Sequence, residues 1–128
     1  MRILILDDNA DMVRSLELVL QHGGFDAATA LNGKEALALQ HDRPADVLIT
    51  DILMPDVDGM EIIDQFRKRW PRVRIIAMSG GGEVLKGDYL SVASPIGVDV
   101  TLRKPVDPDR LMQLLTEFAK TPPAQPGA

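Results

Sequence analysis

Residues 48–60 read LITDILMPDVDGM, an apolar run that ends on the carboxylate of Asp51 and is followed by a turn. The apolar part does not alternate with polar residues, which is typical of a strand covered on both faces. Pro55 and Gly59 then break the chain into a loop. We therefore expect Asp51 at the carboxyl end of a buried strand, the edge where open α/β sheets bind their ligands.

The same pattern occurs near the start of the chain, where the apolar run Ile3 to Leu6 stops at Asp7-Asp8. Three further segments have strand character: Phe25 to Ala30, Ile75 to Met78, and Val98 to Leu102. The first of these is the least apolar, which favours an edge position. The second ends on Ser79, and the third is followed closely by Lys104.

Helical patterns alternate with these strands. Asn9 can cap a helix that Gly23-Gly24 ends, and other helices are expected to begin near Asn32-Gly33, Gly59 and Asp107-Pro108. Leu85 to Ile96 also has roughly helical spacing. Because Gly87 and Pro95 oppose a long helix, that segment is expected to be short or mobile.

Five strands alternating with five helices predict an α/β fold, a doubly wound parallel sheet with helices on both faces. Residues 1–120 are expected to form one domain. Residues 121–128, TPPAQPGA, have no periodicity and are interpreted as a disordered tail.

Charge and composition narrow the function. The 128 residues carry a net charge of −5 and a pI near 4.9, which argues against nucleic acid or an anionic membrane as a partner. The absence of cysteine excludes disulfides and thiolate metal sites. Strand-like sequence begins at once, without a signal peptide, and no apolar run approaches the roughly 20 residues of a membrane span. A cytoplasmic protein is expected.

The polar residues at the strand ends define a candidate site. With the first and third strands adjacent, Asp7, Asp8 and Asp51 converge, and Ser79 and Lys104 line the same edge. Three carboxylates this close repel one another unless a cation lies among them, and Mg²⁺ fits best because it takes oxygen ligands. Together with a lysine and a hydroxyl, they form a site for a phosphoryl group that Asp51 attacks.

These features resemble the receiver domain of two-component response regulators over residues 1–120. The matching motifs are Asp7-Asp8, Asp51 with the segment Met54 to Gly59, Ser79, and Lys104-Pro105. The resemblance implies a flavodoxin-like strand order of 2-1-3-4-5. It also implies a cis peptide bond between Lys104 and Pro105.

The resemblance further assigns roles to the site residues. Asp51 would be the phosphoacceptor for a phosphohistidine of a sensor histidine kinase or phosphotransfer protein. Asp7, Asp8, Asp51 and the backbone carbonyl of Leu53 would bind Mg²⁺. Ser79 and Lys104 would contact the phosphoryl oxygens.

Because only the tail follows the last expected helix, a stand-alone signalling protein without a DNA-binding or enzymatic output domain is expected. Its output would come through a downstream protein target, or by competition for phosphoryl groups as a sink. One departure affects this output, because Thr101 stands where receivers usually carry an aromatic residue, three positions before the lysine. Any conformational signal is therefore expected in the segment from Gly80 to Ile96.

Each part of the site also has a simpler explanation. An Asp pair at the start of a helix is often only a cap, and Ser79 or Lys104 alone could be a turn residue or a solvated charge. Their shared placement at strand ends favours function. His22 and His41 have no acidic or histidine partner at ligand spacing and are interpreted as surface residues.

Two other classes of function stay open. Asp56-Val57-Asp58-Gly59 mimics the Asp-x-Asp-Gly signature of haloacid-dehalogenase-like phosphatases, which also use an Asp nucleophile and Mg²⁺. That signature should directly follow a strand, but here Met54-Pro55 precedes it, and the chain is short for such a fold. A phosphorylation-independent adaptor is the third possibility, against which the intact set of acids argues.

Overall fold

The structure, a computed structural model, describes residues 1–52, 59–79 and 98–120. Its strands are β1 (Arg2–Leu6), β2 (Asp26–Ala30), β3 (Val47–Asp51), β4 (Arg74–Ser79) and β5 (Val100–Arg103). Its helices are α1 (Ala10–His22), α2 (Gly33–Asp42), α3 (Gly59–Arg69) and α5 (Pro108–Lys120). The fifth expected helix, the Gly80 to Ile96 segment and the tail at 121–128 lie outside these residues. The described part therefore confirms five strands and four of the five expected helices.

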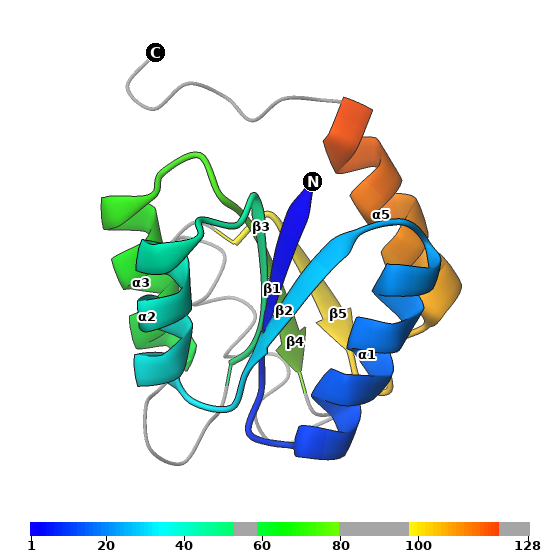
Figure 1. Ribbon diagram of the computed structural model, residues 1–128, viewed down its shortest axis with the longest axis horizontal. Coiled ribbons are helices and arrows are strands. Elements are labelled where there is room, and N and C mark those ends of the chain that lie inside the picture. The colour runs from blue at the N-terminus through cyan, green and yellow to red at the C-terminus, as the bar shows by residue number, and fades with distance from the viewer. Residues whose placement is uncertain (53–58, 80–97, 121–128) are drawn as a thin grey trace.

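The five strands form one parallel sheet in the order β2-β1-β3-β4-β5 (Figure 1). This is the predicted strand order, with β2 at one edge. Strand β1 lies between β2 and β3, so that Leu6 pairs with Ala30 on one side and Thr50 on the other. The order reverses at β1, and the two strands that end on acidic residues are direct neighbours.

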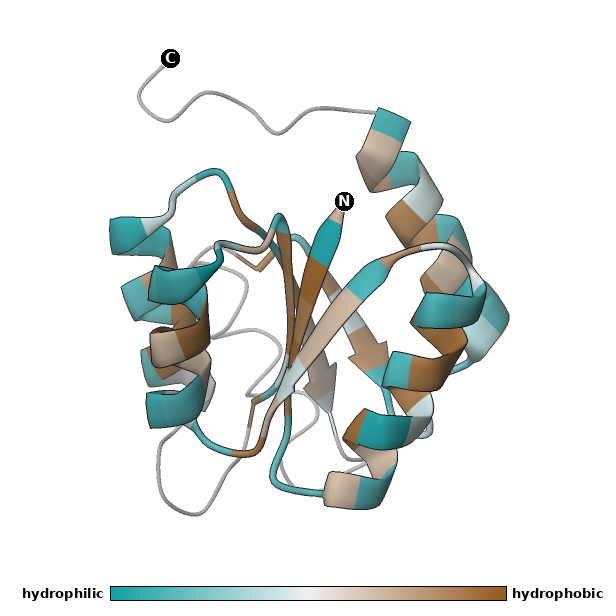
Figure 2. Ribbon diagram, in the orientation of Figure 1, coloured by the Kyte–Doolittle hydropathy of each residue, from teal (hydrophilic) through white to brown (hydrophobic). Residues whose placement is uncertain are grey.

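The helices cover both faces of the sheet, with α1 and α5 on one side and α2 and α3 on the other (Figure 1). Strands β1, β3 and β4 are apolar over most of their length because successive residues enter different cores. In β1, Ile3 and Ile5 pack against α1 and α5, whereas Leu4 and Leu6 pack in the cluster that contains Phe66 of α3. Figure 2 shows these apolar strands between helices whose outer surfaces are hydrophilic.

The predicted helix starts are confirmed by their caps. The Asn9 side chain accepts a hydrogen bond from the Met12 N–H at 3.1 Å, and the Asn32 side chain accepts one from Glu35 N–H at 2.8 Å. The Glu35 carboxylate in turn accepts the Leu31 N–H at 3.1 Å. These side chains satisfy backbone donors that the first helical turn leaves unpaired, which fixes where α1 and α2 begin.

Small differences from the sequence predictions occur at β5. The strand begins at Val100, two residues after the expected start, and extends to Arg103. Just before the strand, the Asp99 backbone N–H donates to the Ile75 carbonyl at 2.9 Å, and the Asp99 carboxylate accepts the Ile75 N–H at 2.7 Å. Thr101 lies half-buried in β5 and pairs with Ala77.

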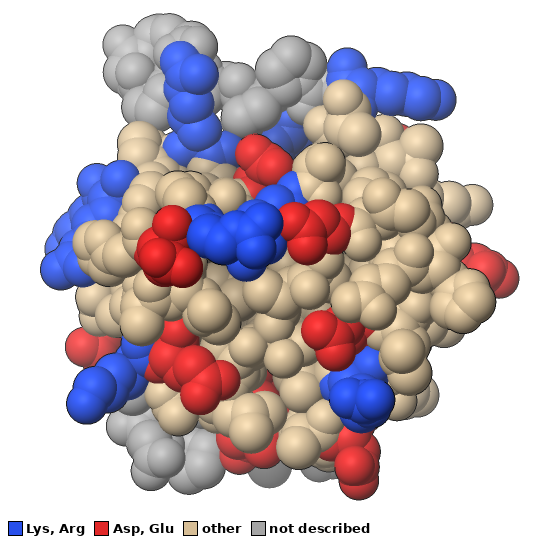
Figure 3. Space-filling model, in the orientation of Figure 1, with Lys and Arg blue, Asp and Glu red and all other residues tan. Residues whose placement is uncertain are grey.

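The face of the molecule drawn in Figure 3 carries charged side chains of both signs. On the face that Figure 3 shows, acidic and basic side chains are interspersed and do not form a broad patch of one sign. Among the described helices, none has both the length and the apolar character needed to cross a membrane.

Candidate functional site

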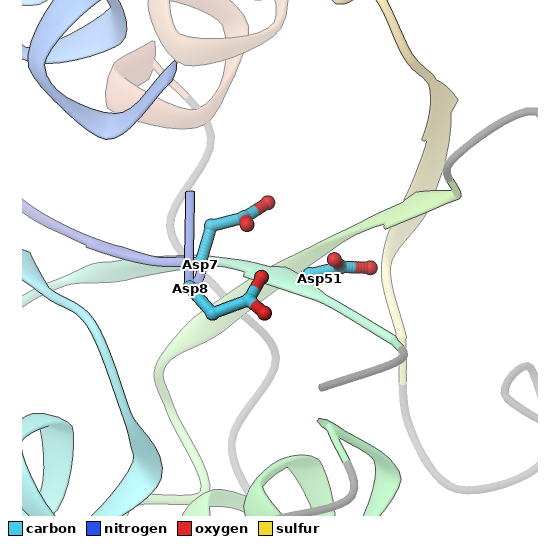
Figure 4. Close-up of side chains that lie close together, drawn as sticks. All are labelled: Asp7, Asp8 and Asp51. Atoms are coloured by element: carbon cyan, nitrogen blue, oxygen red, sulfur yellow. The ribbon is translucent and has the colours of Figure 1, made fainter. Parts of the chain in front are cut away.

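Three carboxylates meet at the carboxyl end of the sheet. Asp51 is the last residue of β3, and Asp7 and Asp8 directly follow the end of the neighbouring β1. Figure 4 shows the three side chains close together. One oxygen from each lies within 4.8 Å of the others. The structure therefore brings together the three acids that the sequence analysis predicted.

The three acids differ in burial. Asp7 is fully buried, Asp51 is 8% exposed, and Asp8 is exposed at the mouth of the site. The backbone N–H of Asn9 donates to an Asp7 carboxylate oxygen at 2.9 Å, which orients that side chain from below. Asp7 thus forms the floor of the site and Asp8 its solvent-facing edge.

Lys104 supplies a positive charge to this site. It follows β5, two strands away from β3, and its long side chain reaches across to the acids. The Lys104 ammonium donates to Asp7 at 2.5 Å and to Asp51 at 3.0 Å. Its backbone N–H donates to the Ser79 carbonyl at 2.7 Å, and its peptide bond to Pro105 is cis, as predicted.

The electrostatics of the site follow from this arrangement. Partial loss of hydration within the site raises the pKa of the Asp8 carboxyl above its ordinary value although the residue is exposed, and a hydrogen bond with Asp7 and the negative charges of Asp7 and Asp51 raise it further. Partial burial alone would lower the pKa of Lys104, but its hydrogen bonds to Asp7 and Asp51 outweigh that effect and raise it. Lys104 therefore remains an ammonium group, and the surrounding carboxylates carry more negative charge than it neutralises.

Of the two remaining predicted site residues, Ser79 and Leu53, the structure describes only Ser79. Ser79 ends β4 at the same edge of the sheet and is buried, one residue beyond Met78, which pairs with Asp51. Leu53 lies outside the described residues. Sequence reasoning missed the Asn9 backbone donor, because a backbone group carries no signal in the sequence.

The donor set fits a hard divalent cation. Three carboxylates offer oxygen ligands around a shared point, and Mg²⁺ is bound by such oxygens together with water. Excess negative charge beside a buried acid favours a bound cation, since it relieves repulsion among the acids. The residues able to hold it are Asp7, Asp8 and Asp51.

Comparisons with known proteins agree with this geometry. A family model described as the response regulator receiver domain matches residues 3–116. A response regulator receiver protein of Anaeromyxobacter sp. is 36% identical over 113 residues, which cover 88% of this chain and 46% of that protein. The transcriptional regulatory protein GlrR of Escherichia coli is 30% identical over 115 residues, 90% of this chain and 25% of that protein. The chain thus spans less than half the length of these two relatives.

Other relatives match over nearly their full length. The chemotaxis protein CheY of Thermotoga maritima is 30% identical over 120 residues, 93% of this chain and 98% of that protein. A solved receiver domain protein of Clostridium thermocellum has a TM-score of 0.84 at 28% identity and covers 93% of this chain and 94% of its own. A CheY-like receiver from Methanospirillum hungatei has a TM-score of 0.83, also at 28% identity, with coverage of 93% of both chains.

Proposed function

This chain belongs to the response regulator receiver domain family of two-component systems, and on that premise we propose that Asp51 accepts a phosphoryl group from a phosphohistidine. Receiver domains are in general signalling proteins rather than enzymes. The observation that supports the proposal most is the convergence of Asp7, Asp8 and Asp51 around the Lys104 ammonium.

The proposed transfer uses the Asp51 carboxylate as the nucleophile. One of its oxygens attacks phosphorus, forming a P–O bond as the P–N bond to the histidine breaks, and the electron pair of that bond stays on the imidazole nitrogen. Such a reaction depends mainly on positioning and charge neutralisation. Lys104, within 3.0 Å of Asp51, can neutralise charge on the phosphoryl oxygens, and Ser79 offers a hydroxyl at the same sheet edge.

Mg²⁺ is the proposed cofactor. Asp7, Asp8, Asp51 and the backbone carbonyl of Leu53 would hold it, and when bound it would offset the negative charge shared by the acids and the phosphoryl group. The buried Asp7, fixed by the Asn9 N–H, would keep the carboxylates in place whether or not the ion is bound.

The proposed partners are proteins. The phosphodonor would be a sensor histidine kinase or a phosphotransfer protein, and the phosphorylated domain would act on a downstream protein target or serve as a phosphoryl sink. Relatives named as a chemotaxis protein and as transcriptional regulatory proteins represent two kinds of output in this family.

The proposal is tested by labelling with acetyl phosphate and Mg²⁺, followed by intact mass spectrometry. We expect one phosphoryl group per chain, none in Asp51→Asn, and none in EDTA. Asp46→Asn is the matched control, since Asp46 immediately precedes β3 at its opposite end and should leave labelling unchanged. Undiminished labelling of Asp51→Asn, or equal labelling in EDTA, would contradict the assignment.

The same samples distinguish a receiver from the two alternative functions, a phosphatase and a phosphorylation-independent adaptor. Continuous turnover of a phosphate ester would favour a phosphatase, whereas a receiver should be labelled stoichiometrically. Absence of any Mg²⁺-dependent labelling would favour the phosphorylation-independent adaptor.

A further inference from the structure

A cavity lies at the end of the sheet opposite to Asp51. It has a volume of about 540 Å³ and is formed by the amino ends of β3 and β4, the start of the chain and the last turn of α5. Figure 1 shows the start of β1 and the end of α5 at the same end of the molecule. Val47 lines this cavity and Asp51 ends the same strand, so about 13 Å of extended backbone separates the two sites.

The inner wall of this cavity is apolar. Ala45, Val47 and Val73 line it and are themselves buried, and Phe118 contributes a half-buried aromatic ring. The volume lies within the range of roughly 300–1,000 Å³ that is usual for sites of small organic molecules. Such a wall favours an aromatic or branched apolar group.

The rim of the cavity is positively charged on balance. Arg72 and Arg74 line it together with one acid, Asp46. The Asp46 carboxylate accepts the backbone N–H of Arg2 at 2.8 Å, which offsets part of its charge. A guanidinium group carries several N–H donors in a planar fork that matches a carboxylate or phosphate. The rim therefore favours an anionic group.

Arg74 lies where the positively charged rim of the cavity meets its apolar wall. Its guanidinium carbon lies 4.8 Å from the centroid of the Phe118 ring. A ring that already stacks with a guanidinium places the cationic group directly beside the apolar wall. A ligand with an apolar body and one anionic group would contact both at once.

Helix electrostatics explain the neighbouring cations but not these two. Arg67, Lys68 and Arg69 lie in the last turn of α3, where they complement the negative end of the helix dipole. Arg72 and Arg74 lie beyond the helix, in the loop and at the start of β4. Their placement at the rim puts two guanidinium groups beside the apolar wall of the cavity.

We infer that this cavity binds a small amphipathic anion, a compound with an aromatic or branched apolar body and one carboxylate, sulfonate or phosphate group. The site is separate from the phosphoacceptor and does not depend on the proposed function. It is sized for a small molecule, so a soluble compound rather than a partner protein is the expected occupant.

The test is a fluorescence titration of the full chain with anilinonaphthalene sulfonate, an aromatic anion, and with neutral N-phenylnaphthylamine, which lacks the charge. The anion should bind saturably to one site and shift the amide NMR signals of Ala45, Val47 and Val73. The neutral probe should bind at least about tenfold more weakly, the effect of losing one charge-assisted hydrogen bond.

Variants of the two arginines test the charge directly. Arg72→Gln and Arg74→Gln should each weaken binding of the anion about tenfold and leave the neutral probe unchanged. Arg110→Gln, at an exposed cation in the first turn of α5, is the matched control and should have no effect. Because Arg74 is half-buried, the exposed Arg72 provides a variant that does not depend on packing.

Four results would overturn the inference. The first is equal affinity for the charged and the neutral probe. The second is a set of shifted amide signals that lies away from the amino ends of β3 and β4. The third is an Arg72→Gln variant that behaves like the Arg110→Gln control. The fourth is the absence of saturable binding of either probe, which is expected of a surface that serves only a partner protein.

Discussion

The two ends of the sheet differ in how acidic side chains are paired with cationic ones. At the carboxyl end, Asp7, Asp8 and Asp51 lie within reach of one another around a single ammonium group. At the amino end, acids are matched with arginines, as in Arg2 with Asp26 at 3.0 Å and Arg67 with Asp99 at 2.6 Å. The unbalanced charge at the carboxyl end is available to a ligand, whereas these two ion pairs at the amino end join separate elements of the fold. Arg72 and Arg74, which line the cavity at the amino end, belong to neither of these two pairs.

The Arg67–Asp99 pair shows how the amino end is stabilised. Arg67, near the end of α3, donates to the carbonyls of Pro71 and Val73 at 2.9 and 2.8 Å as well as to Asp99. The same Asp99 oxygen accepts the Ile75 N–H at 2.7 Å. One ion pair thus ties α3, β4 and the start of β5 together, and it needs no ligand to complete it.

Removing the ammonium from the carboxyl end should have the largest effect on stability. In EDTA, Lys104→Met leaves the buried Asp7 beside Asp51 without a cation, and we expect a loss of about 3 kcal/mol in the free energy of unfolding. Saturating Mg²⁺ should restore much of this, because it replaces the missing charge, and should therefore stabilise the variant more than the wild type. Urea unfolding with and without Mg²⁺ measures both effects.

Arg103→Met is the control for Lys104→Met, since Arg103 is the preceding residue and is exposed. It should change stability little in either condition. If Mg²⁺ stabilised Lys104→Met no more than the wild type, the unbalanced charge at this end would not be the source of the effect.

Breaking the Arg67–Asp99 ion pair at the amino end should lower the free energy of unfolding somewhat less, and Mg²⁺ should not restore this loss. Arg67→Ala removes two hydrogen bonds to carbonyls and leaves Asp99 without this partner, for which we expect a loss of about 2 kcal/mol. Lys68→Ala removes only an exposed pair with Asp64 and should cost about 0.5 kcal/mol or less. Equal losses from the two variants in urea unfolding, or rescue of Arg67→Ala by Mg²⁺, would show that the two ends do not differ as described.

The smallest change in stability is expected for Asp8→Asn, and it is a gain in stability rather than a loss. The pKa of this carboxyl is raised above the ordinary 3.8, so the native state binds its proton more tightly than the unfolded chain does. Ionised Asp8 therefore reduces stability as the pH rises from 3.8 towards the raised value. In EDTA, Asp8→Asn should be more stable than the wild type by a margin that grows through this interval, while its stabilisation by Mg²⁺ should be weaker.

Asp11→Asn is the matched control for Asp8→Asn. Asp11 is exposed in the first turn of α1, where a negative charge is favourable, so its neutralisation should lower stability slightly. Thermal unfolding across the pH series compares the two. A margin for Asp8→Asn that shrinks as the pH rises would contradict the assigned direction of the shift.

Much of the architecture and the centre of the site could be predicted from sequence. Apolar runs that stop at Asp7 and Asp51 mark the ends of two buried strands, and Asn9 and Asn32 mark two helix starts, because these signals are local in the chain. The Arg67–Asp99 ion pair could not be predicted from the sequence. Its partners are 32 residues apart, and neither stands out from other surface charges in the sequence.

The cavity lined by Arg72 and Phe118 was missed for the same reason. Its walls come from four separate parts of the chain, and none of those parts has a pattern that differs from ordinary core or surface sequence. A cavity is the space left between packed elements, so it depends on how they meet and not on any one segment.

The order of residues along this chain is enough to place each acid at the end of a strand, since apolar runs, turns and caps are properties of neighbouring residues. It does not specify that Lys104 reaches Asp7, 97 residues away, or that one oxygen from each of three acids falls within 4.8 Å. Those distances depend on β1 lying beside β3 and on the packing of helices against both faces of the sheet. Contacts between distant segments are set by the whole core at once, which is why the tertiary structure is needed to see them.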